Sequence, residues 1–157
     1  MSTVMGIDPS LTSTGWAVIR DGELIGHGTI GSKNDGVKRL IDLEEGVIKL
    51  MESYFPDFVA IEGYAFGAAN KAHQVGEWGG VLRRLLYKWC FGREDKWKEY
   101  PPTVVKKFCT GKGNGKKEDM KLWAYKKWGV EFKTNDECDA YVLAKLAEKE
   151  MESRGGE

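Results

Sequence analysis

The sequence predicts an α/β fold, in which a mixed five-stranded sheet is flanked by α-helices. Three observations lead to this prediction: three short strands near the N-terminus, a helical apolar repeat that runs into a buried strand, and a second succession of helix and strand after it. The length of 157 residues falls within the range of one domain. We therefore expect residues 1–157 to form a single domain with its own core.

The first three strands are expected to be antiparallel. Residues 4–7 are apolar and lead into Asp8 and a proline, which cannot donate to a strand ladder and keeps the residue before it out of a helix. A short buried strand should therefore end at Asp8. The Asp-Gly pair at 21–22 is typical of a type I′ hairpin turn, and it joins strands expected over 14–20 and 23–30.

Helices then alternate with the remaining strands. Apolar residues recur at helical spacing over 36–54, and the apolar run at 58–61 predicts a buried strand that delivers Glu62 at its end. The other expected elements are a helix over 68–91, a strand over 97–100, a helix over 103–108 that Thr103 caps, a glycine-rich loop over 111–115, a helix over 116–128, and a last helix from Asp136 that Thr134 or Asn135 caps.

The composition excludes several classes of protein. Basic and acidic residues number 24 each, so bulk charge does not favour coating by nucleic acid. The segment 96–133 differs, because it holds eleven lysines and only four acidic residues. There is no apolar run of membrane-spanning length and no basic-then-apolar leader. Cys90, Cys109 and Cys138 match no zinc-site spacing, and we expect a reduced, cytoplasmic protein.

Four carboxylates carry the predicted chemistry. Asp8 and Glu62 end strands, and Asp136 and Asp139 share one face of a helix about 5 to 6 Å apart. Such a group cannot stay ionised without a cation, and two Mg²⁺ ions about 3.5 to 4 Å apart suit displacement at a phosphodiester. Each acid alone has a structural alternative, such as a helix-dipole partner or a turn former. The structural alternative is weakest for Glu62, because this acid directly follows four apolar residues.

The segments around these acids resemble the RuvC family of Holliday junction resolvases, in the RNase H-like (retroviral integrase) superfamily. They are Met-Gly-Ile-Asp-Pro-Ser at 5–10, Thr-Gly-Trp-Ala-Val-Ile at 14–19, Ala-Ile-Glu at 60–62 and Asp-Glu-Cys-Asp-Ala at 136–140. The resemblance spans nearly the whole chain and implies an RNase H-like fold. The short length and the divergent connecting segments are more similar to the phage-encoded branch than to the bacterial housekeeping enzymes.

The resemblance implies a structure-selective endonuclease that nicks four-way (Holliday) DNA junctions in pairs, with other branched DNA as an open alternative. Asp8, Glu62, Asp136 and Asp139 would hold two Mg²⁺ ions per active site, and Mn²⁺ could substitute for them. Water would attack the scissile phosphate and leave a 5′-phosphate and a 3′-hydroxyl. A homodimer with two active sites is implied. No membrane partner is expected, and the sequence does not identify a branch-migration motor.

Three glycines interrupt the long helix expected over 68–91. Interior glycine costs a helix roughly 1 kcal/mol relative to alanine, so Gly76, Gly79 and Gly80 predict close approach of another element or subunit. The segment 75–81 also resembles the glycine-rich dimer-interface helix of the RuvC family.

Lysines and aromatic residues are the candidates for DNA contacts. Lys106 and Lys117 fall where the family places lysines at the phosphates, and Lys107 and Lys116 are adjacent alternatives. The family carries an aromatic wedge three positions after its glutamate. Here that position is alanine. The aromatic residues on either side of it, either of which could stack on an unpaired base, are Tyr64 and Phe66.

Three other readings compete with a resolvase. The segment 8–15 also resembles the first phosphate loop of actin-like and sugar-kinase ATPases, but 157 residues supply only one of the two halves that such folds need. A nuclease for RNA–DNA hybrids would share the acids, and a non-catalytic junction-binding module would be expected to have lost one. Trp123 and Trp128 are expected in the core, and neither His27 nor His73 is expected to bind metal.

Overall fold

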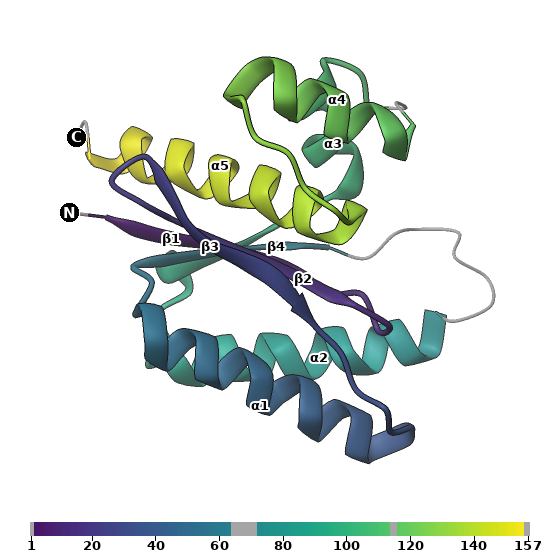
Figure 1. Ribbon diagram of the computed structural model, residues 1–157. Helices are drawn as coiled ribbons and strands as arrows, with labels where there is room; N and C mark the ends of the chain where they lie inside the picture. Colours follow the sequence, from purple (N-terminus) through teal and green to yellow (C-terminus); the bar gives the residue numbers. More distant parts are fainter. Residues whose placement is uncertain (1, 64–71, 114–115, 156–157) are drawn as a thin grey trace.

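The computed structural model describes residues 2–63, 72–113 and 116–155, and its centre is a twisted five-stranded sheet (Figure 1). The strands lie in the order β3-β2-β1-β4-β5. Their bounds are β1 (Thr3–Asp8), β2 (Thr14–Arg20), β3 (Glu23–Ile30), β4 (Phe58–Glu62) and β5 (Trp97–Tyr100). The first three are antiparallel neighbours, whereas β4 pairs in parallel with both β1 and β5. The predicted mixed sheet of five strands is thereby confirmed.

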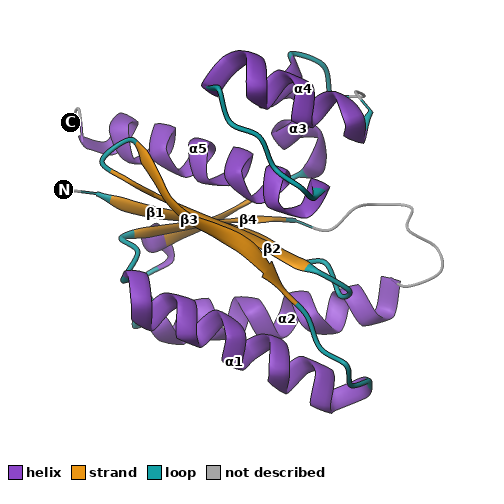
Figure 2. Cartoon of the chain, viewed as in Figure 1, coloured by secondary structure: helices purple, strands orange, loops and turns teal. Residues whose placement is uncertain are grey.

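Helices cover both faces of the sheet (Figure 2). One face packs against α1 (Gly36–Tyr54) and α2 (Ala72–Trp89). The other packs against α5 (Asn135–Gly155), with α3 (Pro102–Thr110) and α4 (Lys117–Trp128) beside it. A single 3₁₀ turn, η1 (Glu94–Lys96), precedes β5. Within the described residues, no helix combines the length and apolar character needed to cross a membrane.

One predicted capping residue is found at the start of its helix, and another is not. Thr134 is the cap of α5, because its Oγ1 accepts a hydrogen bond from the Glu137 N–H at 3.1 Å. The expectation that Thr103 caps α3 is wrong, since the helix already begins at Pro102, after Pro101 in the cap position. Proline is pre-organised for the first helical turn, where its missing N–H costs nothing. The predicted start of α2 at residue 68 lies outside the described residues.

The alternation of side chains along the strands decides which residues face α5. In β1, Met5 and Ile7 belong to the core on the α1 and α2 side, whereas Val4 belongs to the core under α5. Asp8 shares the parity of Val4 and so faces α5 as well. The same parity in β4 places Phe58 and Ala60 under α5. The acid at the end of that strand, Glu62, therefore turns to the same side.

Two glycines let α5 lie directly on the backbone of the sheet. A Cβ atom on Gly6 would stand 2.0 Å from the carbonyl oxygen of Ala140, and one on Gly15 would stand 2.1 Å from the carbonyl oxygen of Asp136. Gly15 is also the strand partner of Asp8. Only residues without a side chain fit at these two places, and they set the position of α5 over the ends of β1 and β2.

Replacing Gly6 with alanine should lower the stability of the protein, because the added methyl would collide with the backbone of α5. Overpacking of this kind costs about 1 to 3 kcal/mol or more, which urea unfolding will measure. Gly155→Ala is the matched control, since a Cβ there meets nothing within 4 Å. Equal unfolding midpoints for wild type and Gly6→Ala would contradict this packing argument.

Candidate metal centre

The ends of two neighbouring parallel strands supply the first two carboxylates. β1 pairs with β4 so that Ile7 lies beside Ile61, and the next residues along each strand are Asp8 and Glu62. Because parallel strands end at the same edge of a sheet, both acids emerge at one place. Their shared parity directs both side chains toward α5.

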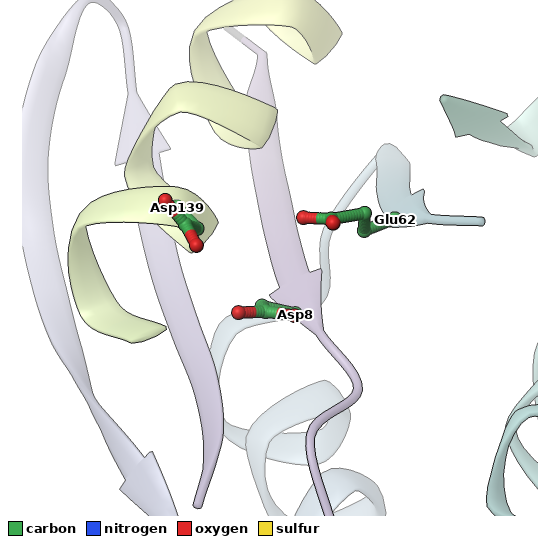
Figure 3. Close-up of side chains that lie close together, drawn as sticks. All are labelled: Asp8, Glu62 and Asp139. Atoms are coloured by element: carbon green, nitrogen blue, oxygen red, sulfur yellow. The ribbon is translucent and has the colours of Figure 1, made fainter. Parts of the chain in front are cut away.

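The N-terminal turn of α5 brings the other two acids to this edge. One carboxylate oxygen from each of Asp8, Glu62 and Asp139 lies within 4.8 Å of the other two, and the three side chains point into a common space (Figure 3). Asp136, one turn earlier on α5, lines the same cavity. The four acids that the sequence singled out are therefore brought together by three separate elements.

A cavity of about 230 Å³ opens over these carboxylates. Its remaining wall comes mainly from α3 and α4, through Val105, Lys106 and Met120, with Ser10 from the segment after β1. The sequence analysis did not single out Ser10, Val105 or Met120, because no local pattern shows that α3 and α4 fold over the strand ends. Lys106 supplies a positive charge to the cavity, whose other ionisable lining groups among the described residues are acids.

Burial and mutual repulsion act on Asp8. Its burial raises the pKa of the carboxyl group well above its ordinary value, and the charges of Glu62, Asp139 and Asp136 raise this pKa further. A group of hard oxygen ligands in this state is suited to a divalent cation, which removes the repulsion. The donor set thus fits a divalent metal site.

A hydrogen-bonded clamp holds the start of α5 in place. Glu137 is buried, and its carboxylate accepts from Thr134 Oγ1 and pairs with His27 Nδ1 on β3, both at 2.9 Å. Burial by itself would raise the pKa of Glu137, but the hydrogen bonds from His27 and Thr134 outweigh it and the pKa is lowered. The sequence analysis missed Glu137, which lies between two of the candidate metal ligands. Among the described residues, the carboxylate cluster includes no histidine.

The predicted DNA-contacting residues differ in their placement. Lys106 lines the cavity, whereas Lys107 on α3 and Lys116 before α4 are exposed. Lys117 is the first residue of α4, and its side chain is not described. The two candidate wedge residues, Tyr64 and Phe66, lie outside the described residues.

The close approach expected at the glycines of α2 is not seen for all three of them within the described part of the chain. A Cβ atom on Gly76 or Gly80 would meet nothing within 4 Å, while Gly79 is buried. The expected close approach at Gly76 and Gly80 is therefore not made by another described element of the same chain.

Only one of the two tryptophans expected in the core lies there. Trp128 packs against the core and contacts Tyr141 edge-on, with ring centroids 5.7 Å apart. Trp123 is 37% exposed, and Lys126 Nζ lies 5.1 Å from its ring centroid. The expectation is wrong for Trp123 because α4 buries only a narrow stripe of its surface, formed by Met120 and Ala124.

Asp8→Asn should make the metal-free protein more stable. Folding raises the pKa of Asp8, so over the range between the unfolded and folded pKa values the folded state retains a proton that the unfolded state has lost. Stability therefore falls as the pH rises through that range, from about pH 4 upward. An amide removes this cost, and we expect the thermal midpoint in EDTA at neutral pH to rise by about 2 to 4 °C per kcal/mol gained.

Thermal unfolding measured by scanning calorimetry should also show that Mg²⁺ stabilises the wild type and has little effect on Asp8→Asn. A ligand that binds the folded state stabilises it more, the more tightly it binds. Glu52→Gln, at an exposed position on α1, is the control. A lower midpoint for Asp8→Asn in EDTA would instead assign this carboxylate a structural role.

Comparison with known proteins places the chain in a family. A model of the crossover junction endodeoxyribonuclease RuvC family matches residues 4–144, a span that includes all four acids. Proteins named crossover junction endodeoxyribonuclease RuvC are similar in sequence to this chain. That of Rhizobium johnstonii is 32% identical over 152 residues, covering 90% of this chain and 86% of the relative. That of Brucella anthropi is 31% identical over 149 residues, covering 90% and 84%.

Solved structures share the fold. The RuvC of Thermus thermophilus in complex with a Holliday junction substrate superposes with a TM-score of 0.77 at 22% identity, covering 98% of both chains. These named relatives are bacterial, and the expected likeness to the phage-encoded branch is not borne out. The match over nearly the whole chain, together with relatives above 30% identity, shows that the chain belongs to the RuvC family of crossover junction endodeoxyribonucleases.

Proposed function

We propose that this protein is a metal-dependent endonuclease that resolves four-way (Holliday) DNA junctions and leaves 5′-phosphate ends. The observation that carries the proposal is the convergence of Asp8, Glu62 and Asp139 within 4.8 Å beside a cavity that also holds a lysine. The relatives named crossover junction endodeoxyribonuclease support the reaction class. The junction-bound Thermus thermophilus relative has the same fold and supports the choice of DNA substrate.

The proposed cofactor is Mg²⁺, with two ions per active site and Mn²⁺ able to replace them. Carboxylate oxygens are the protein ligands that Mg²⁺ prefers. Asp8, Glu62 and Asp139 would hold the ions, and Asp136 on the cavity wall would complete the set. When bound, the ions supply Lewis acidity at the phosphate and make water a nucleophile at neutral pH.

The side chains around the cavity have separate tasks. Lys106 would pair with a non-bridging oxygen of the scissile phosphate, which orients that group and offsets its charge. Val105 and Met120 close one wall of the cavity with apolar surface, so that they limit the access of bulk water. Glu137, through His27 and Thr134, keeps α5 and its two carboxylates in register with the strand ends.

DNA beyond the scissile phosphate would lie across the lysine-rich part of the chain. Lys107, Lys116 and Lys117 are the proposed phosphate contacts, and they make binding dependent on salt. Tyr64 and Phe66 remain the proposed aromatic contacts at the junction centre, on a segment outside the described residues.

The proposed active form is a homodimer of a single nuclease domain spanning residues 1–157. Two equivalent sites would allow paired nicks across a symmetric junction. A Cβ atom on Gly80 would meet no described residue within 4 Å, which supports α2 as the contact face, with Gly76 and Gly79 in the same segment. We place the activity in the cytoplasm, since the three cysteines are free and buried.

Cleavage of an end-labelled four-way junction tests the reaction. We expect paired nicks near the crossover in Mg²⁺ and none in EDTA, with linear duplex and an RNA–DNA hybrid of the same sequence left intact. Asp8→Asn and Glu62→Gln should each lower the rate by at least about 1,000-fold, because each removes a metal ligand. Junction binding should stay intact, because neither change removes a phosphate contact.

Each outcome of this assay assigns a function. Tight junction binding without nicks in Mg²⁺ or Mn²⁺ would contradict the proposal and favour a binding module. Cutting of the hybrid alone would move the protein to the ribonuclease H branch. The exposed Glu52→Gln variant, which should cut at the wild-type rate, excludes a general effect of removing charge.

Gly80→Ala tests the dimer face. In an isolated helix this change should stabilise by roughly 1 kcal/mol, and no described residue lies within 4 Å of the added methyl. Across a tightly packed helix interface the same methyl should weaken association about tenfold or more, which sedimentation will measure. An undiminished dimer would assign the subunit contact to another surface, and Gly155→Ala is the control.

A further inference from the structure

We propose that Trp78 and Thr14 are positioning residues of the metal centre, which act through a buried hydrogen-bonded chain on the segment that follows Asp8. The inference rests on the proposed function only in that the carboxylate cluster binds divalent cations. Neither residue touches the cavity. Their effect would pass through Ser10, which does.

The hydrogen-bonded chain leads from α2 to the end of β1, and each bond donates in the same direction. Trp78 Nε1 donates to Thr14 Oγ1 at 3.1 Å, and Thr14 Oγ1 donates to the carbonyl oxygen of Ser10 at 2.6 Å. The N–H of Ser10 donates in turn to the carbonyl oxygen of Asp8 at 2.8 Å. Three consecutive hydrogen bonds thus connect the middle of α2 to a carboxylate-bearing residue of the metal centre.

The Thr14 hydroxyl group acts both as a donor and as an acceptor. A hydroxyl has one hydrogen to donate and lone pairs to accept with, and here the hydrogen goes to Ser10 while the indole of Trp78 occupies a lone pair. Both side chains are fully buried, where water cannot replace a lost partner. A buried hydrogen-bonded chain of this kind holds its members in one geometry.

The segment that these bonds hold is the one that directly follows Asp8 at the end of β1. Residues 9–13 join Asp8 at the end of β1 to Thr14 at the start of β2. Ser10 lines the metal cavity, and Leu11 is buried in the same core cluster as Trp78. Fixing the carbonyl of Ser10 therefore fixes the path of the chain as it leaves the buried carboxylate.

Another tryptophan shows that burial of an indole does not require such a bond. Trp97 Nε1 on β5 is buried and has no hydrogen-bond partner among the residues that the structure describes, and Trp97 packs against the same core cluster as Trp78. Replacing either tryptophan with phenylalanine removes an indole N–H from one core. Only at Trp78 does the change also break a bond directed toward the metal centre.

The test measures Mn²⁺ affinity of the full chain by titration calorimetry without DNA, for Thr14→Val, Thr14→Ser, Trp78→Phe and Trp97→Phe. We expect Thr14→Val and Trp78→Phe each to weaken Mn²⁺ binding about tenfold, the lower end of what outer ligand-orienting residues contribute. Thr14→Ser keeps the hydroxyl, and Trp97→Phe removes the same ring atoms as Trp78→Phe together with an indole N–H that has no partner among the described residues. Both should bind Mn²⁺ as the wild type does.

Non-additivity supplies a second readout. The double variant Thr14→Val with Trp78→Phe should bind Mn²⁺ no more weakly than Thr14→Val alone, because the two residues act through one chain. Effects that simply multiply would overturn the proposal. If Thr14→Val fails to fold, the Mn²⁺ affinity of Trp78→Phe tests the proposal instead. This variant keeps the hydrogen bond from Thr14 to Ser10 and is therefore expected to fold.

If a folded Trp78→Phe protein bound Mn²⁺ with wild-type affinity, the three hydrogen bonds would have a structural role only, and the inference would be overturned. Because metal binding is read without DNA, this failure is separate from failure of the proposed function. A wild type that bound Mn²⁺ but cut no junction would contradict the nuclease proposal, while a weakened Trp78→Phe would still support the positioning role.

Discussion

The packing of α5 on the bare backbone of β1 and β2 is the contact on which the candidate metal centre depends. Gly6 and Gly15 bring the helix so close that a methyl group at either position would collide with a backbone carbonyl. This approach lets Asp136 and Asp139 meet the acids at the strand ends. It also points the positive end of the α5 dipole at them, which partly offsets their charge.

The site still concentrates more negative charge than the fold alone can neutralise. The pKa of Asp8 is raised by burial and by its three acidic neighbours, a cost to stability that metal binding removes. Other contacts must hold the elements against this repulsion. Glu137 anchors the start of α5 to β3 through His27, and Trp78 holds the exit from β1 through Thr14. Hydrogen bonds in the surrounding elements thus hold the mutually repelling carboxylates in place.

Local patterns predicted most of the fold and the group of four acids, because apolar runs, turn chemistry and helix spacing depend on residues that are close in the sequence. The Asp-Gly turn is an example, with positive φ at both Asp21 and Gly22. Features set by distant elements escaped prediction. The exposure of Trp123 depends on how α4 packs, and the partnership of Glu137 with His27 joins residues 110 positions apart. No periodicity in the sequence carries such information.

The most direct test of this account is the position of a bound ion. A crystal grown with Mn²⁺ and measured for anomalous scattering locates the metal without reference to activity or substrate. We expect Mn²⁺ to be coordinated by the carboxylates of Asp8, Glu62 and Asp139, which each place one oxygen within 4.8 Å of the other two. Mn²⁺ bound elsewhere, with these three carboxylates free of metal, would contradict it.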